Sequence, residues 1–442
     1  MFKKLFNKKD KKVAILGIDG VPCSLLKEFS EKGIMPNLAS LLKNGTLLEM
    51  DASIPEVSST SWTCFMTGVN PGRHNIYGFT GLKQNSYGFY FPNSGDIKSD
   101  TIWDILGNNN KKSIVINVPS TYPAKPLNGI LTAGFVAVDL RKATYPESAY
   151  EYLKGMGYKM DVDSQKAATS LESLTEDIDL TFSKRTEALF HFFDNHDWDL
   201  FIGTITETDR LHHFLWNALG DTNHPQHNYS IDFYKGIDSL IGKFADRCGE
   251  NIPFMIVSDH GFSAIKQEVY LNSWLKQKGY LKFKKEQPES LEDIHPESLA
   301  FALDPSRIYI NLKNRYPSGT VSESNYEDIR SKIKEDLISL NIDNDKIFKN
   351  VFMREEIYHG NCFEAAPDIV ALANTGFDLK GAINKDSVYG RGIFTGAHTQ
   401  DNATFFINRR IEPGRINIID IAPTVFRLMD IKHTALDGKA LF

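Results

Sequence analysis

Short apolar runs, separated by segments with helical periodicity, are the feature that most constrains how this chain can fold. Five such runs predict buried β-strands at residues 13–18, 113–118, 200–205, 252–257 and 369–373. Helical spacing lies between them, as at 181–193 and 229–245. Strands that alternate with helices are typical of a mainly parallel sheet with helices on both faces. We therefore predict an α/β fold, with an inserted elaboration at about 269–392 where mixed short elements interrupt the pattern.

The run at 252–257 ends in Ser258-Asp259-His260-Gly261, the most informative local pattern in the chain. At the carboxyl end of a parallel strand, Asp259 and His260 would face the crevice in which open α/β sheets bind ligands. A carboxylate beside an imidazole suits Zn²⁺ or Mn²⁺ better than Ca²⁺ or Mg²⁺. An Asp-His pair is also common in ordinary turns, so this interpretation needs support from other parts of the chain.

Three further clusters offer that support. Asp19 ends the first predicted strand, where it is a candidate ligand or a turn residue. Asp209 and His213 stand four residues apart, so on a helix both would face one ion. A helix N-cap Asp followed by a packed His is the alternative for that pair. His398 lies in a glycine-rich loop and is weak evidence by itself.

A run of hydroxyl residues, Ser58-Ser59-Thr60-Ser61, opens a predicted helix. The simplest role of these side chains is to cap that helix. The N-terminus of a helix also presents free backbone N–H groups and the positive end of the dipole. Both favour an anion and assist a nucleophilic alkoxide, so one of these hydroxyls is a candidate nucleophile.

The order of these clusters resembles that of the alkaline phosphatase superfamily, and most closely its type I phosphodiesterase/nucleotide pyrophosphatase branch. The phrase at 66–74, Met-Thr-Gly-Val-Asn-Pro-Gly-Arg-His, is similar to the stretch that follows the nucleophile in that branch. Residues 420–424 and 436–438 resemble the closing strand and helix of the superfamily. The resemblance covers nearly the whole chain.

The resemblance implies a three-layer sandwich with a mainly parallel central sheet and helices on both faces, over residues 13–442. It implies two divalent metal ions, with Zn²⁺ as the first choice and Mn²⁺ as the second. One ion would be held by Asp19, Asp259, His260 and Ser58, and the other by Asp209, His213 and His398. Ser58 is also the catalytic nucleophile in this interpretation.

The function that follows is a two-metal-dependent phosphohydrolase, in the first place a phosphodiesterase with a phosphoseryl intermediate on Ser58. A phosphomonoesterase or phosphonate hydrolase of the same superfamily is the alternative. From another class, a non-catalytic protein whose metals stabilise a binding surface would carry the same ligands. The expected substrate is a small-molecule, lipid or glycan phosphate ester, and the sequence does not reveal the oligomeric state.

Composition limits the classes of partner and the cellular location that we expect for this chain. The sequence has 50 Lys and Arg against 56 Asp and Glu, a formal net charge of −6, so a broad nucleic-acid-binding surface is not expected. The 4 cysteines show no CxxC spacing, as in a reducing compartment. Neither a signal peptide nor a transmembrane span is predicted, which favours the cytoplasm. Residues 1–12 form a predicted flexible basic tail whose Phe2, Leu5 and Phe6 are compatible with peripheral contact to an anionic membrane.

Overall fold

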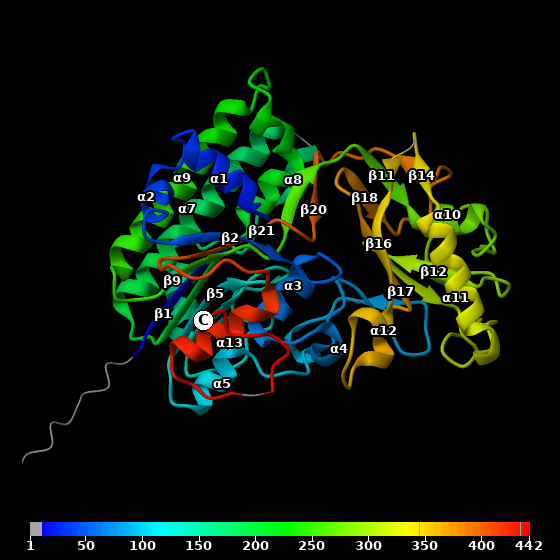
Figure 1. The fold of residues 1–442 in the computed structure, drawn as a ribbon, viewed down its shortest axis with the longest axis horizontal. Coiled ribbons are helices and arrows are strands. Elements are labelled where there is room, and N and C mark those ends of the chain that lie inside the picture. The colour runs from blue at the N-terminus through cyan, green and yellow to red at the C-terminus, as the bar shows by residue number, and fades with distance from the viewer. Residues whose placement is uncertain (1–10, 169, 344, 434) are drawn as a thin grey trace, which may run out of the picture.

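The computed structural model describes residues 11–168, 170–343, 345–433 and 435–442. Apart from Lys11 and Lys12, the predicted basic tail lies outside the described residues. The chain forms two lobes (Figure 1). The larger lobe, on the left of that view, contains the central sheet, and the smaller lobe is built mainly from residues 267–390.

The central sheet has nine strands in the order β22-β2-β21-β9-β1-β8-β5-β6-β7. Neighbouring strands from β9 to β6 all run parallel, whereas β21 is antiparallel to both β9 and β2. The strands are β1 (Val13–Ile18), β2 (Thr46–Asp51), β5 (Ser113–Val118), β6 (Gly129–Ala133), β7 (Thr144–Tyr145), β8 (Leu200–Ile205), β9 (Phe254–Val257), β21 (Ala403–Ile407) and β22 (Ile416–Asn417). The mainly parallel sheet predicted from the sequence is confirmed.

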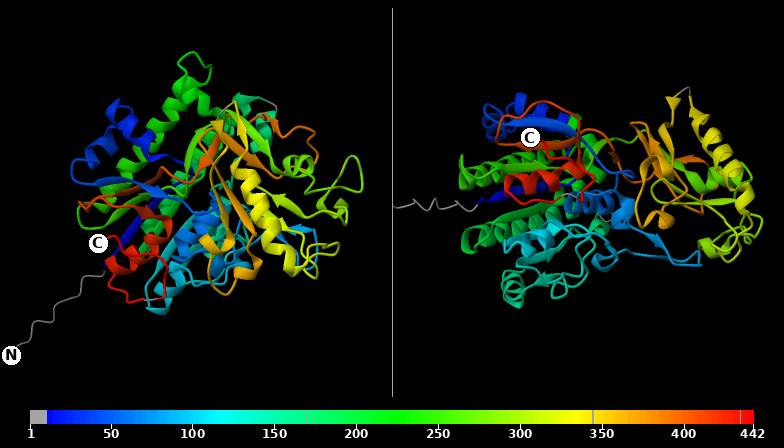
Figure 2. Two further views of the ribbon diagram at one scale, coloured as in Figure 1. Left: turned by 45° about the vertical axis from the view of Figure 1, so that its right-hand side comes forward. Right: turned by 60° about the horizontal axis from the view of Figure 1, so that its bottom comes forward.

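Helices cover both faces of this sheet, which gives three layers (Figure 2). In β1, Ala14, Leu16 and Ile18 pack towards one helical layer, and Val13 and Ile15 towards the other. The first layer contains α1 (Cys23–Glu31), α2 (Pro36–Leu41), α6 (Glu147–Gly155), α7 (Leu171–Asn195), α8 (Glu207–Gly220) and α9 (His227–Cys248). The second contains α3 (Ser58–Thr67), α5 (Ile102–Asn108) and α13 (Ile421–Leu428), with the short α4 (Pro71–His74) after α3.

The smaller lobe has its own hydrophobic core, to which the β3–β4 hairpin of residues 81–90 contributes Tyr87. Its two main sheets have the orders β18-β11-β19 and β12-β13-β17-β16. The strands are β3 (Gly81–Leu82), β4 (Phe89–Tyr90), β11 (Gln267–Tyr270), β12 (Ala300–Leu303), β13 (Arg307–Ile310), β14 (Asn341–Ile342), β15 (Asp345–Lys346), β16 (Phe348–Met353), β17 (Ile369–Ala373), β18 (Phe377–Lys380) and β19 (Tyr389–Gly390). The helices are α10 (Leu271–Gln277), α11 (Glu323–Ile338) and α12 (Arg354–Ile357).

One predicted strand belongs to a different sheet from the one that we expected. Residues 369–373 form β17, which pairs antiparallel with β13 and β16 in the smaller lobe and does not join the central sheet. A continuous apolar run is expected for any strand buried on both faces, so composition does not distinguish the two sheets.

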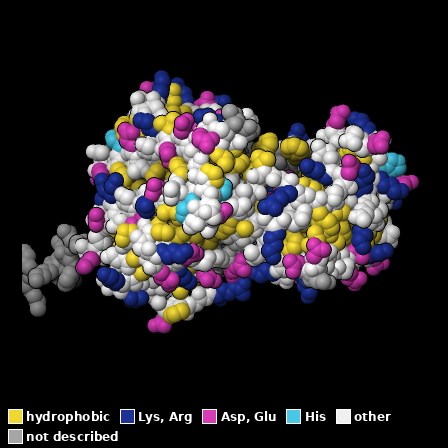
Figure 3. All heavy atoms as spheres, turned by 90° about the horizontal axis from the view of Figure 1, so that it is seen from above, with side chains coloured by type: hydrophobic (Ala, Val, Ile, Leu, Met, Phe, Trp, Pro, Cys, Tyr) yellow, Lys and Arg dark blue, Asp and Glu magenta, His cyan; other side chains and the backbone are white. Residues whose placement is uncertain are grey.

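The surface carries no extended region of one charge on the face shown in Figure 3, where Lys and Arg are interspersed with Asp and Glu. Within the described part of the chain, no helix combines the length and apolar composition needed to span a membrane. The four cysteines are free thiols, as their scattered positions predict.

Candidate metal centre and active site

Three of the predicted clusters meet at one edge of the central sheet, because β9, β1 and β8 are adjacent and parallel. Asp19 follows β1, Asp209 lies in the first turn of α8 directly after β8, and Asp259 and His260 follow β9. His398 reaches the same edge on β20 (Gly396–Thr399), which pairs with β10 (Gly261–Ala264) immediately after His260. Parallel strands therefore assemble ligands that are distant in sequence.

Ser58, the first residue of α3, completes a cluster with Asp19, Asp259 and His260. Its Oγ is 3.2 Å from His260 Nε2 and 3.4 Å from Asp19 Oδ1. His260 Nε2 lies 3.3 Å from Asp259 Oδ2 and 3.6 Å from Asp19 Oδ1. Asp259 is fully buried, and its Oδ2 has no hydrogen-bond partner among the described residues. This oxygen is therefore available to a cation.

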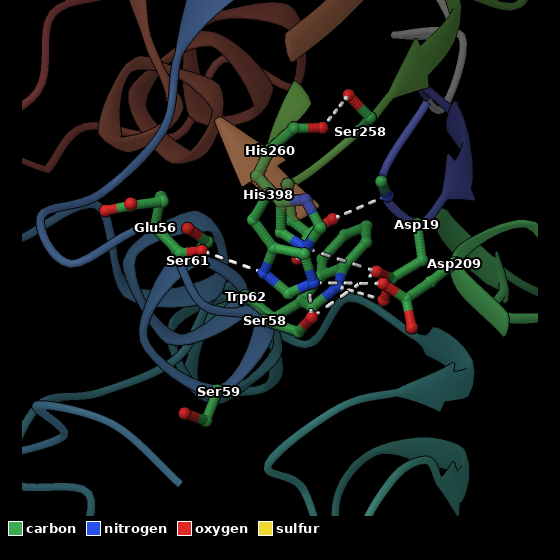
Figure 4. Close-up of polar contacts among 12 residues, drawn as sticks. Asp19, Glu56, Ser58, Ser59, Ser61, Trp62, Asp209, Ser258, His260 and His398 are labelled. Carbon is green, nitrogen blue, oxygen red and sulfur yellow. Dashed lines mark hydrogen bonds and ion pairs between the residues drawn. The ribbon is translucent and has the colours of Figure 1, made fainter. Parts of the chain in front are cut away.

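Asp209, His213 and His398 form the second cluster. His398 Nε2 is 3.2 Å from Asp209 Oδ1 and 3.1 Å from His213 Nε2, and His213 Nε2 is 3.4 Å from Asp209 Oδ1. The two clusters adjoin, since the rings of His260 and His398 stack with centroids 3.6 Å apart. Figure 4 shows these imidazoles next to each other, with dashed lines that lead from their rings to Ser58 and to the carboxylates of Asp19 and Asp209.

The spacing of the donor atoms fits metal ions. Ligand atoms about 2.0–2.2 Å from a tetrahedrally coordinated ion lie roughly 3.3–3.6 Å from one another. The distances in both clusters are 3.1–3.6 Å. In addition, ligand atoms of Asp209, Asp19 and His260 all lie within 4.8 Å of one another, so two ions would be close neighbours. The structure thus brings all the predicted ligands together in an arrangement that suits two ions.

The ring orientation of each imidazole is set by a backbone carbonyl. These carbonyls accept a hydrogen bond from Nδ1–H and leave the lone pair on Nε2, the atom that faces the cluster. The pairs are His213 with Gly396 at 3.3 Å, His260 with Gly261 at 3.0 Å and His398 with Glu56 at 3.0 Å. Main-chain partners of this kind carry no sequence signal, and sequence reasoning did not name them.

Each carboxylate is held through one oxygen, which leaves the other for an ion. Trp62 Nε1 donates to Asp19 Oδ2 at 2.9 Å, and the backbone N–H of Gly20 donates to Asp259 Oδ1 at 3.0 Å. Arg210 Nη1 donates to Asp209 Oδ2 at 3.0 Å. Sequence reasoning missed Trp62 and Arg210. The available signal was position, since Trp62 lies one helical turn after Ser58 and Arg210 directly follows Asp209.

The protonation equilibria reflect a crowded group of buried charges. Burial and the charges of Asp259 and Asp209 raise the pKa of Asp19 well above its usual range. Burial, followed by the charge of Asp209, raises the pKa of Asp259 to about 7. Burial also lowers the pKa of His260 to about 4. Burial opposes ionisation of Asp209 as well, but the imidazoles of His213 and His398 outweigh it and hold its pKa well below the usual value. Bound cations would stabilise all these carboxylates in the charged form.

Among the hydroxyl residues of the predicted helix start, Ser58 is the one that reaches the cluster. The Ser59 side chain points away from it (Figure 4), and Ser61 Oγ lies 2.7 Å from Ser53 Oγ. The carbonyl of Val57 accepts from Thr60 and Ser61, whereas no described residue accepts the N–H groups of Ser58 and Ser59. The α3 N-terminus therefore presents two free donors beside the Ser58 hydroxyl.

A further histidine, His212, is buried beside the site and bonded on both ring nitrogens. Nδ1 lies 2.9 Å from the carbonyl of Gly20, and Nε2 lies 2.6 Å from the hydroxyl of Tyr234. Burial lowers its pKa to about 3. His212 therefore has a structural role and supplies no ligand atom.

A cavity of about 860 Å³ opens beside the second cluster, between the two lobes. Its walls include Glu56, His213 and His398 from the larger lobe, and Asp304 and Lys380 from the smaller. Burial raises the pKa of Glu56 to about 7. A substrate group in this cavity would extend from the metal clusters towards the smaller lobe.

Comparison with solved structures supports the fold. A phosphonoacetate hydrolase from Sinorhizobium meliloti 1021 in complex with phosphonoacetate matches with a TM-score of 0.65 and 16% identity, over 95% of each chain. An inactive form of the murine ectonucleotide pyrophosphatase/phosphodiesterase 5 in complex with AMP matches with a TM-score of 0.59 and 13% identity, over 97% of each chain. The human protein of that name matches with a TM-score of 0.58 and 13% identity, also over 97% of each chain. No curated protein matches the sequence.

The family comparison covers far more than half of the chain. Residues 13–401 match the type I phosphodiesterase / nucleotide pyrophosphatase family. These residues include every predicted ligand and the whole cavity between the lobes. As the sequence predicts, the chain belongs to this family of phosphoester hydrolases within the alkaline phosphatase superfamily.

Proposed function

We propose that the protein is a two-metal-dependent phosphodiesterase that acts through a phosphoseryl intermediate on Ser58. The observation that carries the proposal is the position of Ser58 Oγ, 3.2 Å from His260 Nε2 and 3.4 Å from Asp19 Oδ1, at a helix N-terminus with free N–H groups. With three histidines in the donor set, Zn²⁺ is the first choice for the ions and Mn²⁺ the second.

In this mechanism Asp19, Asp259, His260 and Ser58 would hold one ion, and Asp209, His213 and His398 the other. When bound, divalent ions lower the pKa of hydroxyl groups and water at the site and offset negative charge on the phosphoryl oxygens. The Ser58 hydroxyl gives up its proton, Oγ forms a bond to phosphorus as the bond from phosphorus to the leaving oxygen breaks, and the leaving oxygen takes up a proton to become the free alcohol. The N–H groups of Ser58 and Ser59 donate to a nonbridging oxygen.

The second half of the reaction releases the phosphoryl group from Ser58. Water attacks phosphorus from the side that the first alcohol left, the bond from phosphorus to Ser58 Oγ breaks, and Oγ regains its proton. Each displacement is in line and inverts the phosphorus centre. The two together retain its configuration.

The first test compares bis(p-nitrophenyl) phosphate with p-nitrophenyl phosphate on protein reconstituted with zinc or manganese. We expect kcat/KM for the diester to exceed that for the monoester by about tenfold or more. Acid quenching during turnover of the diester, followed by peptide mass spectrometry, should locate the phosphoryl group on Ser58. A preference for the monoester would instead indicate a phosphomonoesterase.

Phosphonoacetate is a third substrate for the same assay, because a phosphonoacetate hydrolase is among the structural neighbours. Faster turnover of phosphonoacetate than of either nitrophenyl ester would favour the phosphonate hydrolase alternative. Full metal content without turnover of any of the three compounds would favour a non-catalytic metal-stabilised protein.

A further inference from the structure

The cavity between the lobes has more negative than positive side chains in its walls. Its carboxylates come from both lobes and are Glu56, Glu289, Asp304 and Asp378. Among the described residues, Lys380 is the single lysine or arginine in this lining. Its charge alone does not balance these carboxylates.

Lys380 is already engaged by carboxylates. Its Nζ lies 2.7 Å from Asp378 Oδ2. Burial would lower the pKa of Lys380, but the charge of Asp378, followed by those of Asp304 and Glu268, outweighs this and raises it. An anionic substrate group would therefore have to compete with these carboxylates for one ammonium group, and Lys380 is a poor anion site.

Asp304 and Glu56 differ from Asp378, because neither forms an ion pair with a described lysine or arginine. Asp304 Oδ1 accepts the backbone N–H of Gly381, and no ion pair joins Asp304 to a described lysine or arginine. Glu56 is 8% exposed, and its Oε2 has no hydrogen-bond partner in the described part of the chain. Two carboxyl groups, one from each lobe, thus line the cavity outside the ion pairs of the described residues, and the charge of Lys380 is shared between Asp378 and Asp304.

The remaining walls are largely apolar and include three aromatic rings, those of Phe79, Phe89 and Phe377. Phe89 is 50% exposed. Aromatic faces attract ammonium groups and accept the methylene groups that carry them. A cavity with apolar walls and carboxyl groups outside these ion pairs is complementary to a short alkyl chain that ends in a positive charge.

We propose that this cavity binds an ammonium-bearing ester group, so that the preferred substrate is a phosphodiester of an amino alcohol. This inference rests on the proposed phosphodiesterase function. His213 and His398 line the cavity and belong to the second metal cluster, so a group bound in the cavity can stay attached to the reacting phosphorus. A carboxylate or second phosphate on that group would meet Asp304 and Glu56 and be disfavoured.

The test uses three p-nitrophenyl diesters that differ in the second alcohol, which is 3-aminopropyl, butyl or 3-carboxypropyl. On zinc-reconstituted protein we expect kcat/KM to fall in that order, by about fivefold at each step. Similar values for all three esters, or the largest value for the carboxypropyl ester, would overturn the inference while leaving the phosphodiesterase function in place. If none of the esters is hydrolysed, the proposed function fails and the inference fails with it.

The three esters also differ in intrinsic reactivity. Comparing wild type with a variant on the same pair of esters cancels that difference. Asp304→Asn keeps the oxygen that accepts from Gly381 and removes the charge, so the ratio of kcat/KM for the aminopropyl and butyl esters should fall by about threefold. Glu412→Gln is the matched control, because Glu412 is exposed, lies outside the cavity lining and loses the same charge. An unchanged ratio in Asp304→Asn, or an equal fall in Glu412→Gln, would contradict the proposal.

Discussion

The carboxylates of the metal clusters and those of the neighbouring cavity are held in different ways. In the clusters, Asp19, Asp209 and Asp259 each have one oxygen bonded to an N–H donor and present the other to the adjacent ligands. In the cavity, Asp304 and Glu56 form no ion pair with a described lysine or arginine, and Glu56 Oε2 has no hydrogen-bond partner among the described residues. In the proposed function, the first arrangement would fix the geometry of the metal ligands, and the second would leave charge available for choosing a substrate. Substitutions in the two regions should therefore affect different kinetic constants.

Ser58→Ala should give the largest effect. We expect kcat for bis(p-nitrophenyl) phosphate to fall by about 1000-fold or more, because the variant lacks the attacking oxygen. Ser59→Ala is the control, since the Ser59 side chain points away from the cluster (Figure 4) and its backbone N–H is kept. A Ser58→Ala variant that retains more than a few per cent of wild-type turnover would show that another group is the nucleophile.

Asp259→Asn should reduce both metal content and activity. We expect elemental analysis to show the loss of about one of two zinc ions, with kcat reduced by about 100-fold. The zinc-free variant should also melt at a higher temperature than zinc-free wild type, because a buried oxygen without a partner no longer carries charge. With zinc added, the order of the two melting temperatures should reverse. Equal zinc content in the two proteins would remove Asp259 from the ligand set.

Arg210→Met should weaken zinc binding at the second cluster by about tenfold, measured by competition with a chromophoric chelator. Arg210 holds Asp209 Oδ2 at 3.0 Å and is itself held by Asp161 Oδ2 at 2.8 Å. Arg210→Lys should recover part of the affinity, because a single ammonium can still donate to Asp209. If both variants bind zinc as tightly as wild type, Arg210 does not position the ligand.

Lys380→Met should have the smallest effect on the kinetic constants, and it tests the cavity without changing a residue of the two clusters. Removing the ammonium leaves Asp378 without its partner at 2.7 Å, so the preference for the aminopropyl over the butyl ester should rise by about twofold. Lys332→Met, at an exposed position on α11 of the same lobe, is the control. A selective loss of activity on the carboxypropyl ester would show instead that Lys380 binds anionic groups.

The parts of the fold that were predictable from sequence are those with a local signal. The runs that form β1, β5 and β8 begin and end where the apolar pattern predicts, and β9 starts two residues late, after Ile252 and Pro253. The central strands β2 and β21 were not predicted. β21 lies between β9 and β2 although about 150 residues separate it from β9 in sequence, and such pairing leaves no periodic signal.

The residues of the candidate site also fall into two groups, those that sequence could predict and those that it could not. Asp19, Asp209 and Asp259 stand at the ends of predicted strands, and their order resembles a known superfamily, so sequence could select them as ligands. Trp62, Arg210 and the carbonyls that orient the imidazoles act through three-dimensional contacts and were missed. The cavity walls come from both lobes, and no single segment encodes their charge balance. The cytoplasmic location and a lipid or glycan substrate stay predictions.

The ladder between β10 and β20 has a consequence for how this protein can evolve. Phe262 pairs with His398 in that ladder, and the chain between the two strands contains almost the whole smaller lobe. In topological terms the smaller lobe is therefore an enlarged β-hairpin turn, whose two ends are joined beside the proposed metal ligands. Under the proposed function, insertions, deletions or exchange of that turn would alter which alcohols are accepted, while the register that places His398 opposite Phe262 would be kept.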